Sequence, residues 1–326
     1  MISVIVPAFN VESTIIRTLD SILKQTCLEM EVIVVDDGST DKTGRILDAY
    51  SSQHERVIVL HTQNQGVTAA RLAGVEQASG EWIGFVDGDD EIEPDMYELL
   101  LENAKQYKAD ISHCGYQMIF ADGRVSYFHN TGCLAVQDRT TGLKDLLDGS
   151  LVEPGLCNKL FRKTLFHSLL HTEMMDRSIK INEDLLMNYV LFSNSNRSVF
   201  QDICKYHYLV RSTSASRTSL NQHKIFDPIR VKQWILNMKI DGMEEAAEKA
   251  YIGTCVNVYN SLVLDRTGQF ALEQKKVWNL MKEHKEWIPC LSRKQQFLAN
   301  LILYWPIGYK PIYRFYAKYF LKNCYE

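Results

Sequence analysis

The sequence predicts an α/β protein, with a mostly parallel central sheet covered by helices on both faces and a helical C-terminal extension. Short apolar runs rich in β-branched residues alternate with segments of helical periodicity in the first part of the chain. Several of these runs end abruptly in acidic or amide residues, as strands do where a sheet meets solvent. Beyond about residue 221 the helical periodicity continues with little strand character.

The alternation of strand and helix patterns is regular over the first quarter of the chain. The expected strands are residues 2–6, 31–35, 57–61 and 82–86. The helices expected between them are residues 14–23, 44–50 and 67–78. Strands separated by helices form parallel sheets, because the chain must cross back over one face before the next strand begins. Further along, strands on either side of Asp122-Gly123 are expected to form a hairpin.

Polar side chains follow the ends of the predicted strands. They are Asn10, Asp36-Asp37, Asn64 and the acidic segment 87–90. Open parallel sheets bind ligands outside the carboxyl ends of their strands, so we expect these groups on one rim. Carboxylates crowded as in segment 87–90 repel one another unless a cation lies among them, and Mg²⁺ or Mn²⁺ prefers such oxygen ligands. An acidic turn ahead of a helix is the alternative interpretation of this segment.

Composition narrows the functional classes. The net charge of −4 gives no basic footprint for nucleic acid, so no nucleic-acid partner is expected. The eight cysteines contain no C-x-x-C pair, which argues against a zinc site or a disulfide scaffold and is typical of a reducing cytoplasm. No signal peptide is expected at the N-terminus. The apolar stretch 297–309 is shorter than the roughly 20 residues that span a bilayer.

Six segments in order give the chain a resemblance to a known family. They are SVIVPAFNVESTI, SILKQT, VIVVDDGSTDKT, NQGVTAARLAGVEQASGEWIGFVDGDD, CNKLFRK and INEDLL. As an ordered set they resemble the family 2 glycosyltransferases, which are inverting enzymes of the Rossmann-like GT-A fold that use nucleotide-diphosphate sugars. The resemblance covers about the first 215 residues. It implies a catalytic domain over 1–220, with a nucleotide-binding half (1–105) and an acceptor-binding half (106–220), and leaves 221–326 as a separate helical region.

The resemblance also implies roles for residues on the donor side. Phe9 would stack on the nucleobase, Glu12 would lie near the ribose, and Asp37 would bond a uracil edge. Arg71 matches an arginine near the nucleotide, although an ion pair with a strand-end aspartate is an equal interpretation. The full set expected to bind the nucleotide-sugar is Pro7, Phe9, Asn10, Glu12, Asp37, Asn64, Arg71, Asp87 and Gly88.

The metal and the base are implied in the same way. Asp87-Gly88-Asp89 matches the D-x-D element, with Mn²⁺ or Mg²⁺ on Asp89 and with Asp90 able to share the task. His207 is a further candidate ligand, and a packed strand histidine is the alternative. Asp184 matches the general base, and Glu183 would orient it or the acceptor. Without the family pattern, the pair would be an ordinary acidic helix start.

The expected function is therefore the transfer of a sugar from a UDP-sugar to a saccharide acceptor, which a lipid would carry, in cell-surface polysaccharide synthesis. Two alternatives remain open, a nucleotidyltransferase and a non-catalytic carbohydrate-binding or assembly subunit. A phosphate contact and a surface charge are equal interpretations for Lys159 and for Arg162. A serine-rich loop over 212–219 is expected to close over the donor.

The C-terminal region 290–326 combines basic and aromatic residues. Six lysines and arginines against one acid give +5, while the rest of the chain carries −9. Basic residues interleaved with tryptophan and tyrosine suit the surface of an anionic membrane. Packing as ordinary core and a homodimer interface are the two alternatives. The expected location is cytoplasmic, with peripheral attachment to the inner face of the cell membrane if the first interpretation holds.

Overall fold

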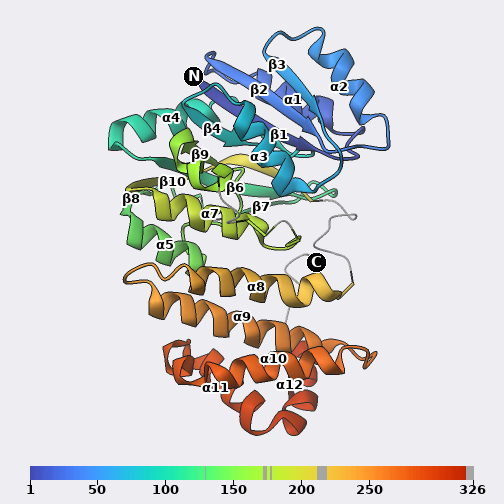
Figure 1. Ribbon diagram of the computed structural model, residues 1–326, viewed down its shortest axis with the longest axis vertical. Helices are drawn as coiled ribbons and strands as arrows, with labels where there is room; N and C mark the ends of the chain where they lie inside the picture. Colours follow the sequence, from blue (N-terminus) through green and yellow to red (C-terminus); the bar gives the residue numbers. More distant parts are fainter. Residues whose placement is uncertain (129, 172–174, 177, 211–218, 321–326) are drawn as a thin grey trace. The chain divides into compact units, whose positions relative to one another are not determined.

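A computed structural model describes residues 1–128, 130–171, 175–176, 178–210 and 219–320. The chain divides into two compact units, Met1–Thr218 and Ser219–Glu326, which are considered separately below. The first unit is built on a mixed sheet and the second is helical (Figure 1). The predicted α/β class with a C-terminal helical extension is thereby confirmed. Most of the loop predicted to close over the donor, residues 212–218, lies outside the described residues.

The first half of the sheet is parallel, as predicted. Its strands are β1 (Ile2–Ala8), β2 (Met30–Asp36), β3 (Val57–His61) and β4 (Trp82–Phe85). They lie in the order β3-β2-β1-β4, and every neighbouring pair runs parallel. Both faces of β1 are covered, because six of its seven residues are buried. A continuous apolar run is typical of such a doubly covered strand.

The second half of the sheet mixes directions. Its strands are β5 (Glu91–Ile92), β6 (Ile111–Ile119), β7 (Val125–Tyr127), β8 (Leu134–Asp138), β9 (Lys159–Arg162) and β10 (Arg197–Leu209). β9 runs antiparallel to both β4 and β6, so it joins the parallel half to the rest. β10 pairs parallel with β6 and antiparallel with β5 and β8. The hairpin predicted around Asp122-Gly123 is present as β6–β7.

Helices connect and cover the strands of this unit. They are α1 (Ile15–Leu23), α2 (Thr43–Ser51), α3 (Val67–Gln77), α4 (Met96–Tyr107), α5 (Arg139–Asp148), the 3₁₀ turn η1 (Lys163–Phe166), α6 (His167–His171) and α7 (Glu183–Asn194). α3 packs on β1 and β2, while α4 packs on β6, β9 and β10. Gly74 of α3 allows the close approach to β1, since a Cβ there would lie 2.5 Å from the Ile5 side chain.

The second unit is a set of helices packed around one central helix, α9 (Glu244–Leu264). The others are α8 (Gln222–Asn237), α10 (Ala271–Glu283), the 3₁₀ turn η3 (Lys285–Cys290), α11 (Arg293–Tyr304) and α12 (Pro306–Phe320). Their shared core includes Tyr251, Val256, Tyr259, Tyr309 and Tyr313. Across residues 219–320 and the other described parts of the chain, no helix combines the length and the apolar character needed to cross a membrane.

Candidate active site

The strand ends of the parallel half gather the polar residues at one rim of the sheet. In the β1–β2 register Ala8 lies beside Asp36, and β4 follows β1 on the other side. The loops that leave these three strands therefore begin next to one another. They carry Phe9, Asp37 and Asp87, which are far apart in the sequence. This is the arrangement expected for open sheets with parallel strands.

The loop after β1 is held by Asn10 and presents Phe9 to solvent. Asn10 has a positive φ of 53°, a conformation that asparagine adopts more readily than most residues. Its side-chain oxygen accepts hydrogen bonds from the amides of Thr40 and Asp41, at 2.8 and 3.3 Å. The Phe9 ring beside it is 47% exposed, a large apolar surface left uncovered at the rim. Such a ring is available to stack on a planar ligand.

Glu12 is also engaged with the loop after β2. Its Oε2 accepts a hydrogen bond from the amide of Lys42 at 2.9 Å, just ahead of α2. Glu12 and Asn10 thus fasten the β1–α1 loop to the β2–α2 loop. The two residues therefore fix the shape of the rim at the ends of β1 and β2.

Asp37 organises the neighbouring loop after β3. Although nearly buried, it accepts hydrogen bonds from the amides of Gln65, at 2.9 Å, and Gly66, at 2.8 Å, one on each oxygen. Asp37 lines a cavity of 180 Å³ together with Thr62, Gln63, Gln65, Ala69, Leu72, Ala73 and Glu76. Asn64 is exposed on the same loop. Asp37 is therefore a fixed acceptor at the wall of a small cavity.

The acidic turn after β4 is packed tightly against the β1 loop. A Cβ on Gly88 would lie 3.1 Å from the carbonyl oxygen of Pro7, so a larger residue would push the two loops apart. The Gly88 carbonyl accepts a hydrogen bond from the Thr14 hydroxyl at 3.0 Å. Asp87 and Asp89 are partly exposed, whereas Asp90 is buried. The turn thus offers two of its three carboxylates to the rim.

Asp90 faces into the protein. Its Oδ2 accepts a hydrogen bond from the Tyr206 hydroxyl at 2.7 Å, and its Oδ1 accepts one from the Leu209 amide at 2.9 Å. Burial, with a smaller contribution from Asp87, raises its pKa to about 7. The same Tyr206 hydroxyl accepts a hydrogen bond from the amide of Asp87 at 3.3 Å. Tyr206 of β10 therefore clamps both ends of the acidic turn.

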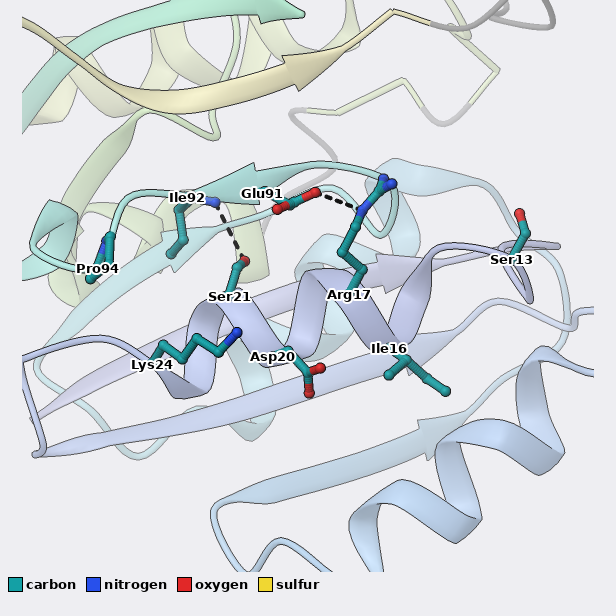
Figure 2. A pocket seen from close by; sticks show the side chains of 9 residues that line it. All are labelled: Ser13, Ile16, Arg17, Asp20, Ser21, Lys24, Glu91, Ile92 and Pro94. Atoms are coloured by element: carbon teal, nitrogen blue, oxygen red, sulfur yellow. Dashed lines mark hydrogen bonds and ion pairs between the residues drawn. The ribbon is translucent and has the colours of Figure 1, made fainter. Parts of the chain in front are cut away.

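α1 holds the turn from the other side. Arg17 donates to the Asp89 carbonyl at 3.2 Å, and its Nε lies 2.6 Å from a carboxylate oxygen of Glu91. Figure 2 shows this ion pair at the edge of a 410 Å³ pocket between α1 and the segment that follows the turn. The Ser21 hydroxyl accepts a hydrogen bond from the Ile92 amide across the same pocket. These contacts fix the backbone of the turn without using the carboxylates of Asp87 or Asp89.

Arg71 joins the acidic turn to a second acidic pair. Its side chain on α3 is only 7% exposed, and Nη2 donates to Asp87 Oδ1 at 3.0 Å. Nη1 lies 3.6 Å from Glu183 Oε1. Burial disfavours the cation, yet Asp87, Glu183 and Asp184 together hold the pKa of Arg71 above its ordinary value. The predicted ion pair with a strand-end aspartate is present, and it extends to the start of α7.

Glu183 and Asp184 form the first turn of α7. Asn182 precedes them with a left-handed φ of 65°, and the Leu185 amide donates to Asp184 Oδ1 at 2.7 Å. Burial, followed by the neighbouring Asp184, raises the pKa of Glu183 to about 7. Burial also raises the pKa of Asp184, against the opposing effect of Arg71. A carboxylate whose pKa is raised in this way is a stronger base than an exposed one.

Lys159 holds the 153–158 loop in place. It is fully buried and donates to the carbonyls of Glu153 and Gly155 and to Asn158 Oδ1, at 2.8, 2.5 and 2.8 Å. Burial lowers its pKa to about 8. The surface-charge interpretation of Lys159 is therefore wrong, because its ammonium group holds the 153–158 loop together. Arg162 pairs with Glu81 at 2.6 Å and lies over the Trp82 ring.

His207 lies on β10 beside β5. Its Nε2 is 2.9 Å from Glu93 Oε1, and its side chain is 17% exposed. In the β10–β5 register it faces Glu91. The structure thus gives His207 a carboxylate neighbour, Glu93, just after the end of β5, and a metal there stays a prediction.

The carboxylates of the acidic turn suit a metal ion that is bound together with the phosphates of a substrate. Within the described ranges, no group of three or more histidine, cysteine, aspartate or glutamate side chains could hold an ion by itself. Asp90 is buried with both oxygens hydrogen-bonded, and Asp87 and Asp89 are partly exposed at the rim. Mg²⁺ is commonly bound by one or two carboxylates together with substrate phosphates. The residues fit such a shared site, and which carboxylate would hold the ion stays a prediction.

Comparisons with known proteins show the family of the chain. Residues 3–170 match the model of the family described as glycosyl transferase family 2. The chain belongs to this family. It is 32% identical over 237 residues to the uncharacterized glycosyltransferase EpsJ of Bacillus subtilis (strain 168). The aligned region covers 72% of this chain and 67% of EpsJ.

Two further similarities extend the comparison of this family 2 glycosyltransferase. Glycosyltransferase GlyA of Streptococcus pneumoniae serotype 4 is 33% identical over 223 residues, which make up 66% of this chain and 31% of GlyA. The structure of S. aureus TarS 1–349 in complex with UDP-GlcNAc matches 97% of this chain and 91% of that chain, with a TM-score of 0.74 at 20% identity. The GT-A fold implied by the sequence is confirmed by this match.

The sequence did not predict the residues that fix the backbone of the candidate site. Tyr206 and Arg17 carry no motif, and their contacts join elements far apart in the chain. Lys159 stands in a matching segment, but its burial depends on the 153–158 loop and is not visible in the pattern. Alternation along β10 puts Tyr206 and His207 on opposite faces, and this was the one available indication that they differ in role.

Proposed function

We propose that this glycosyltransferase moves a sugar from a UDP-sugar to a hydroxyl of a saccharide acceptor, with inversion at the anomeric carbon. The observation that carries the proposal is the buried Arg71, which lies between Asp87 of the acidic turn and Glu183 at the start of α7. Through it, Asp87 of the predicted donor site is linked to Glu183, which is next to the predicted base. Acidic residues from separate elements that converge on one buried cation make this region a candidate functional site.

The nucleotide would lie along the rim formed by the loops after β1, β2 and β3. The exposed Phe9 ring supplies a stacking surface, and Asp37 supplies a carboxylate that can accept an imide N–H. Asp37 is held in place by two backbone amides, so a bound base meets an acceptor that is already ordered. The UDP-GlcNAc named for the TarS structure supports a UDP-sugar as donor.

The diphosphate would lie at the acidic turn. Asp89 would hold a divalent cation jointly with the phosphate oxygens, and Asp87 would point toward the ribose. Bound there, Mn²⁺ or Mg²⁺ would act as a Lewis acid that stabilises the charge on the departing diphosphate. Asp90 stays buried and keeps the turn attached to β10.

Asp184 would act as the general base. An acceptor hydroxyl has a pKa far above 7, so a positioned carboxylate must take its proton as the new bond forms. The oxygen then attacks the anomeric carbon opposite the leaving diphosphate, which turns an α-linked donor into a β-linked product. Glu183 would orient the acceptor, while Arg71 lowers the pKa of both carboxyl groups against the effect of burial.

Saccharide transfer in the synthesis of cell-surface polysaccharides is the biological role we propose. This role rests on the similarity to family 2 glycosyltransferases. A hydroxyl-bearing acceptor would meet the donor at Glu183 and Asp184, in the first turn of α7. Family membership already makes the chain a glycosyltransferase and sets aside the nucleotidyltransferase and the non-catalytic subunit.

A nucleotide-release assay tests the proposal. The purified protein is incubated with UDP-, GDP- and dTDP-sugars in the presence of Mn²⁺, Mg²⁺ or EDTA. We expect slow hydrolysis of one UDP-sugar that EDTA abolishes and that Asp89→Ala reduces by about tenfold or more. Equal turnover of GDP- or dTDP-sugars, or full activity in EDTA, would contradict the assignment of the donor or of the metal.

A further inference from the structure

The second unit exposes a set of large apolar side chains on its last helices. We name the set the α12 aromatic face, and it consists of Tyr304, Trp305, Ile307, Ile312, Phe315 and Tyr319. Tyr304 is 76% exposed, Ile307 85% and Phe315 62%. Ile312, Phe315 and Tyr319 follow one another at i, i+3 and i+7, so they form one stripe along α12. Side chains of this size are rarely left together in water without a partner.

The orientation of α12 is fixed by its opposite stripe. Tyr309 and Tyr313 are buried in the core of the unit, and the Tyr309 hydroxyl donates to Asn260 Oδ1 at 2.5 Å. Arg314 donates to the Val263 carbonyl at the end of α9 at 2.7 Å. Since these contacts hold the inner side of the helix, the apolar stripe cannot turn inward. The interpretation of the region as ordinary core therefore applies to the buried tyrosines but not to the α12 aromatic face.

Charge accompanies the exposed apolar residues. Between positions 290 and 320 the sequence holds five basic residues, Arg293, Lys294, Lys310, Arg314 and Lys318, and no aspartate or glutamate. Lys310 and Lys318 follow at i and i+8, on a stripe next to the apolar one, while Arg314 between them is bonded to the end of α9. The Lys318 ammonium lies 5.2 Å from the centre of the Tyr319 ring. A partner for this surface must therefore offer both an apolar region that the exposed side chains can enter and negative charge.

We propose that the α12 aromatic face binds the surface of an anionic lipid bilayer, with α12 lying in the interface. Acyl chains would take up the apolar stripe, and lipid phosphates would pair with Lys310 and Lys318. Tyrosine and tryptophan prefer this boundary between apolar and aqueous layers. A second copy of the chain fits less well, because a twofold interface would bring the same basic stripes toward each other. The proposal does not depend on the donor or the acceptor.

Vesicle flotation with the full chain tests the proposal. The protein is mixed with vesicles of phosphatidylcholine alone, or of phosphatidylcholine with phosphatidylglycerol. We expect flotation with the anionic vesicles at about 0.1 M salt and release at about 1 M, where charges are strongly screened. Lys310→Gln with Lys318→Gln should weaken binding by about 30-fold, since each charge near the surface contributes roughly fivefold. The matched pair Lys275→Gln with Lys285→Gln, exposed on α10 and η3, should bind as the parent does.

The apolar part is tested with its own control. Ile312→Ser, Phe315→Ser and Tyr319→Ser combined should abolish flotation while nucleotide release stays unchanged. Leu272→Ser, at a 73% exposed position of α10, should leave flotation unchanged. Absence of flotation by the parent protein, or equal flotation with neutral vesicles, would overturn the proposal. A dimer in light scattering that the triple variant converts to monomer, without any vesicle binding, would assign the face to a second copy instead.

Discussion

Arg71 is a buried cation whose neighbours come from the acidic turn and from α7. Its guanidinium lies 3.0 Å from Asp87 and 3.6 Å from Glu183. Burying a charge is unfavourable unless it is paired, so Arg71 depends on these carboxylates as they depend on it. The pKa values of Glu183 and Asp184 are raised by burial and lowered by Arg71, and the balance leaves Glu183 at about 7.

Replacing Arg71 by methionine should shift the pH dependence of the reaction. The proposed base works only when ionised, so activity rises with pH through the pKa of the acidic pair. Without the nearby cation that pKa increases, and the acidic limb of the kcat/KM profile should move up by about 1 pH unit or more. Arg71→Lys keeps the charge and should keep the position of the limb. A folded Arg71→Met enzyme with an unmoved acidic limb would show that Arg71 does not act on the base.

Asp89 and Asp90 should respond differently to substitution by asparagine. Asp89→Asn should weaken metal-dependent binding of the UDP-sugar by about tenfold or more, whereas Asp90→Asn should leave it nearly unchanged. Calorimetric titration of UDP with Mn²⁺ measures both. Comparable losses in the two variants would mean that Asp90, despite its contacts with Tyr206 and Leu209, also reaches the metal.

Asp90 should also make the free energy of unfolding depend on pH. Its pKa is about 7 in the folded protein against an ordinary value of 3.8, so the folded state binds the proton more tightly than the unfolded state. The stability that this contributes is full below about pH 4 and is lost as pH rises toward 7, up to about 4 kcal/mol. The free energy of unfolding of the parent should therefore fall across this range relative to that of Asp90→Asn. Parallel pH profiles for the two proteins would contradict the raised pKa.

At the scale of elements, β10 positions the acidic turn that leaves β4. One hydroxyl on this strand, that of Tyr206, donates to Asp90 and accepts from the Asp87 amide. From the opposite side, Arg17 of α1 holds the Asp89 carbonyl. The loops after β1 and β2 are joined in the same manner by Asn10. The site is thus built on loops whose backbones are fixed by contacts from neighbouring elements.

Tyr206→Phe should loosen the turn without touching the base. The variant leaves Asp90 and the Asp87 amide without their shared partner, at a cost of about 1–3 kcal/mol in the free energy of unfolding. Because the turn carries the donor site, KM for the UDP-sugar should rise several-fold while kcat changes little. Tyr127→Phe, at an exposed position of β7, serves as the control. A fall in kcat at unchanged KM would contradict the positioning role.

At the scale of the whole molecule, the sequence predicted those features that local patterns encode. The four parallel strands of the first half have the apolar runs of doubly covered strands, and the ordered motifs identified the family. The direction of β9 could not be predicted, because its antiparallel pairing with β4 and β6 joins residues about 80 and 50 positions apart. The burial of Asp90 and Lys159 likewise depends on tertiary packing. The site was therefore predicted as a set of residues, but its internal supports were not.

The measurement that tests the central claim most directly is the behaviour of Asp184→Asn. Asparagine preserves the size of the side chain but cannot accept the proton of the acceptor. The account predicts that the variant binds UDP and metal as the parent does, while its kcat falls by about 10²–10⁴-fold. Binding is measured by titration calorimetry, and turnover by the release of UDP from the active donor. Full turnover in the variant, or a loss of UDP binding that matches the loss of turnover, would contradict the assignment of Asp184 as the base.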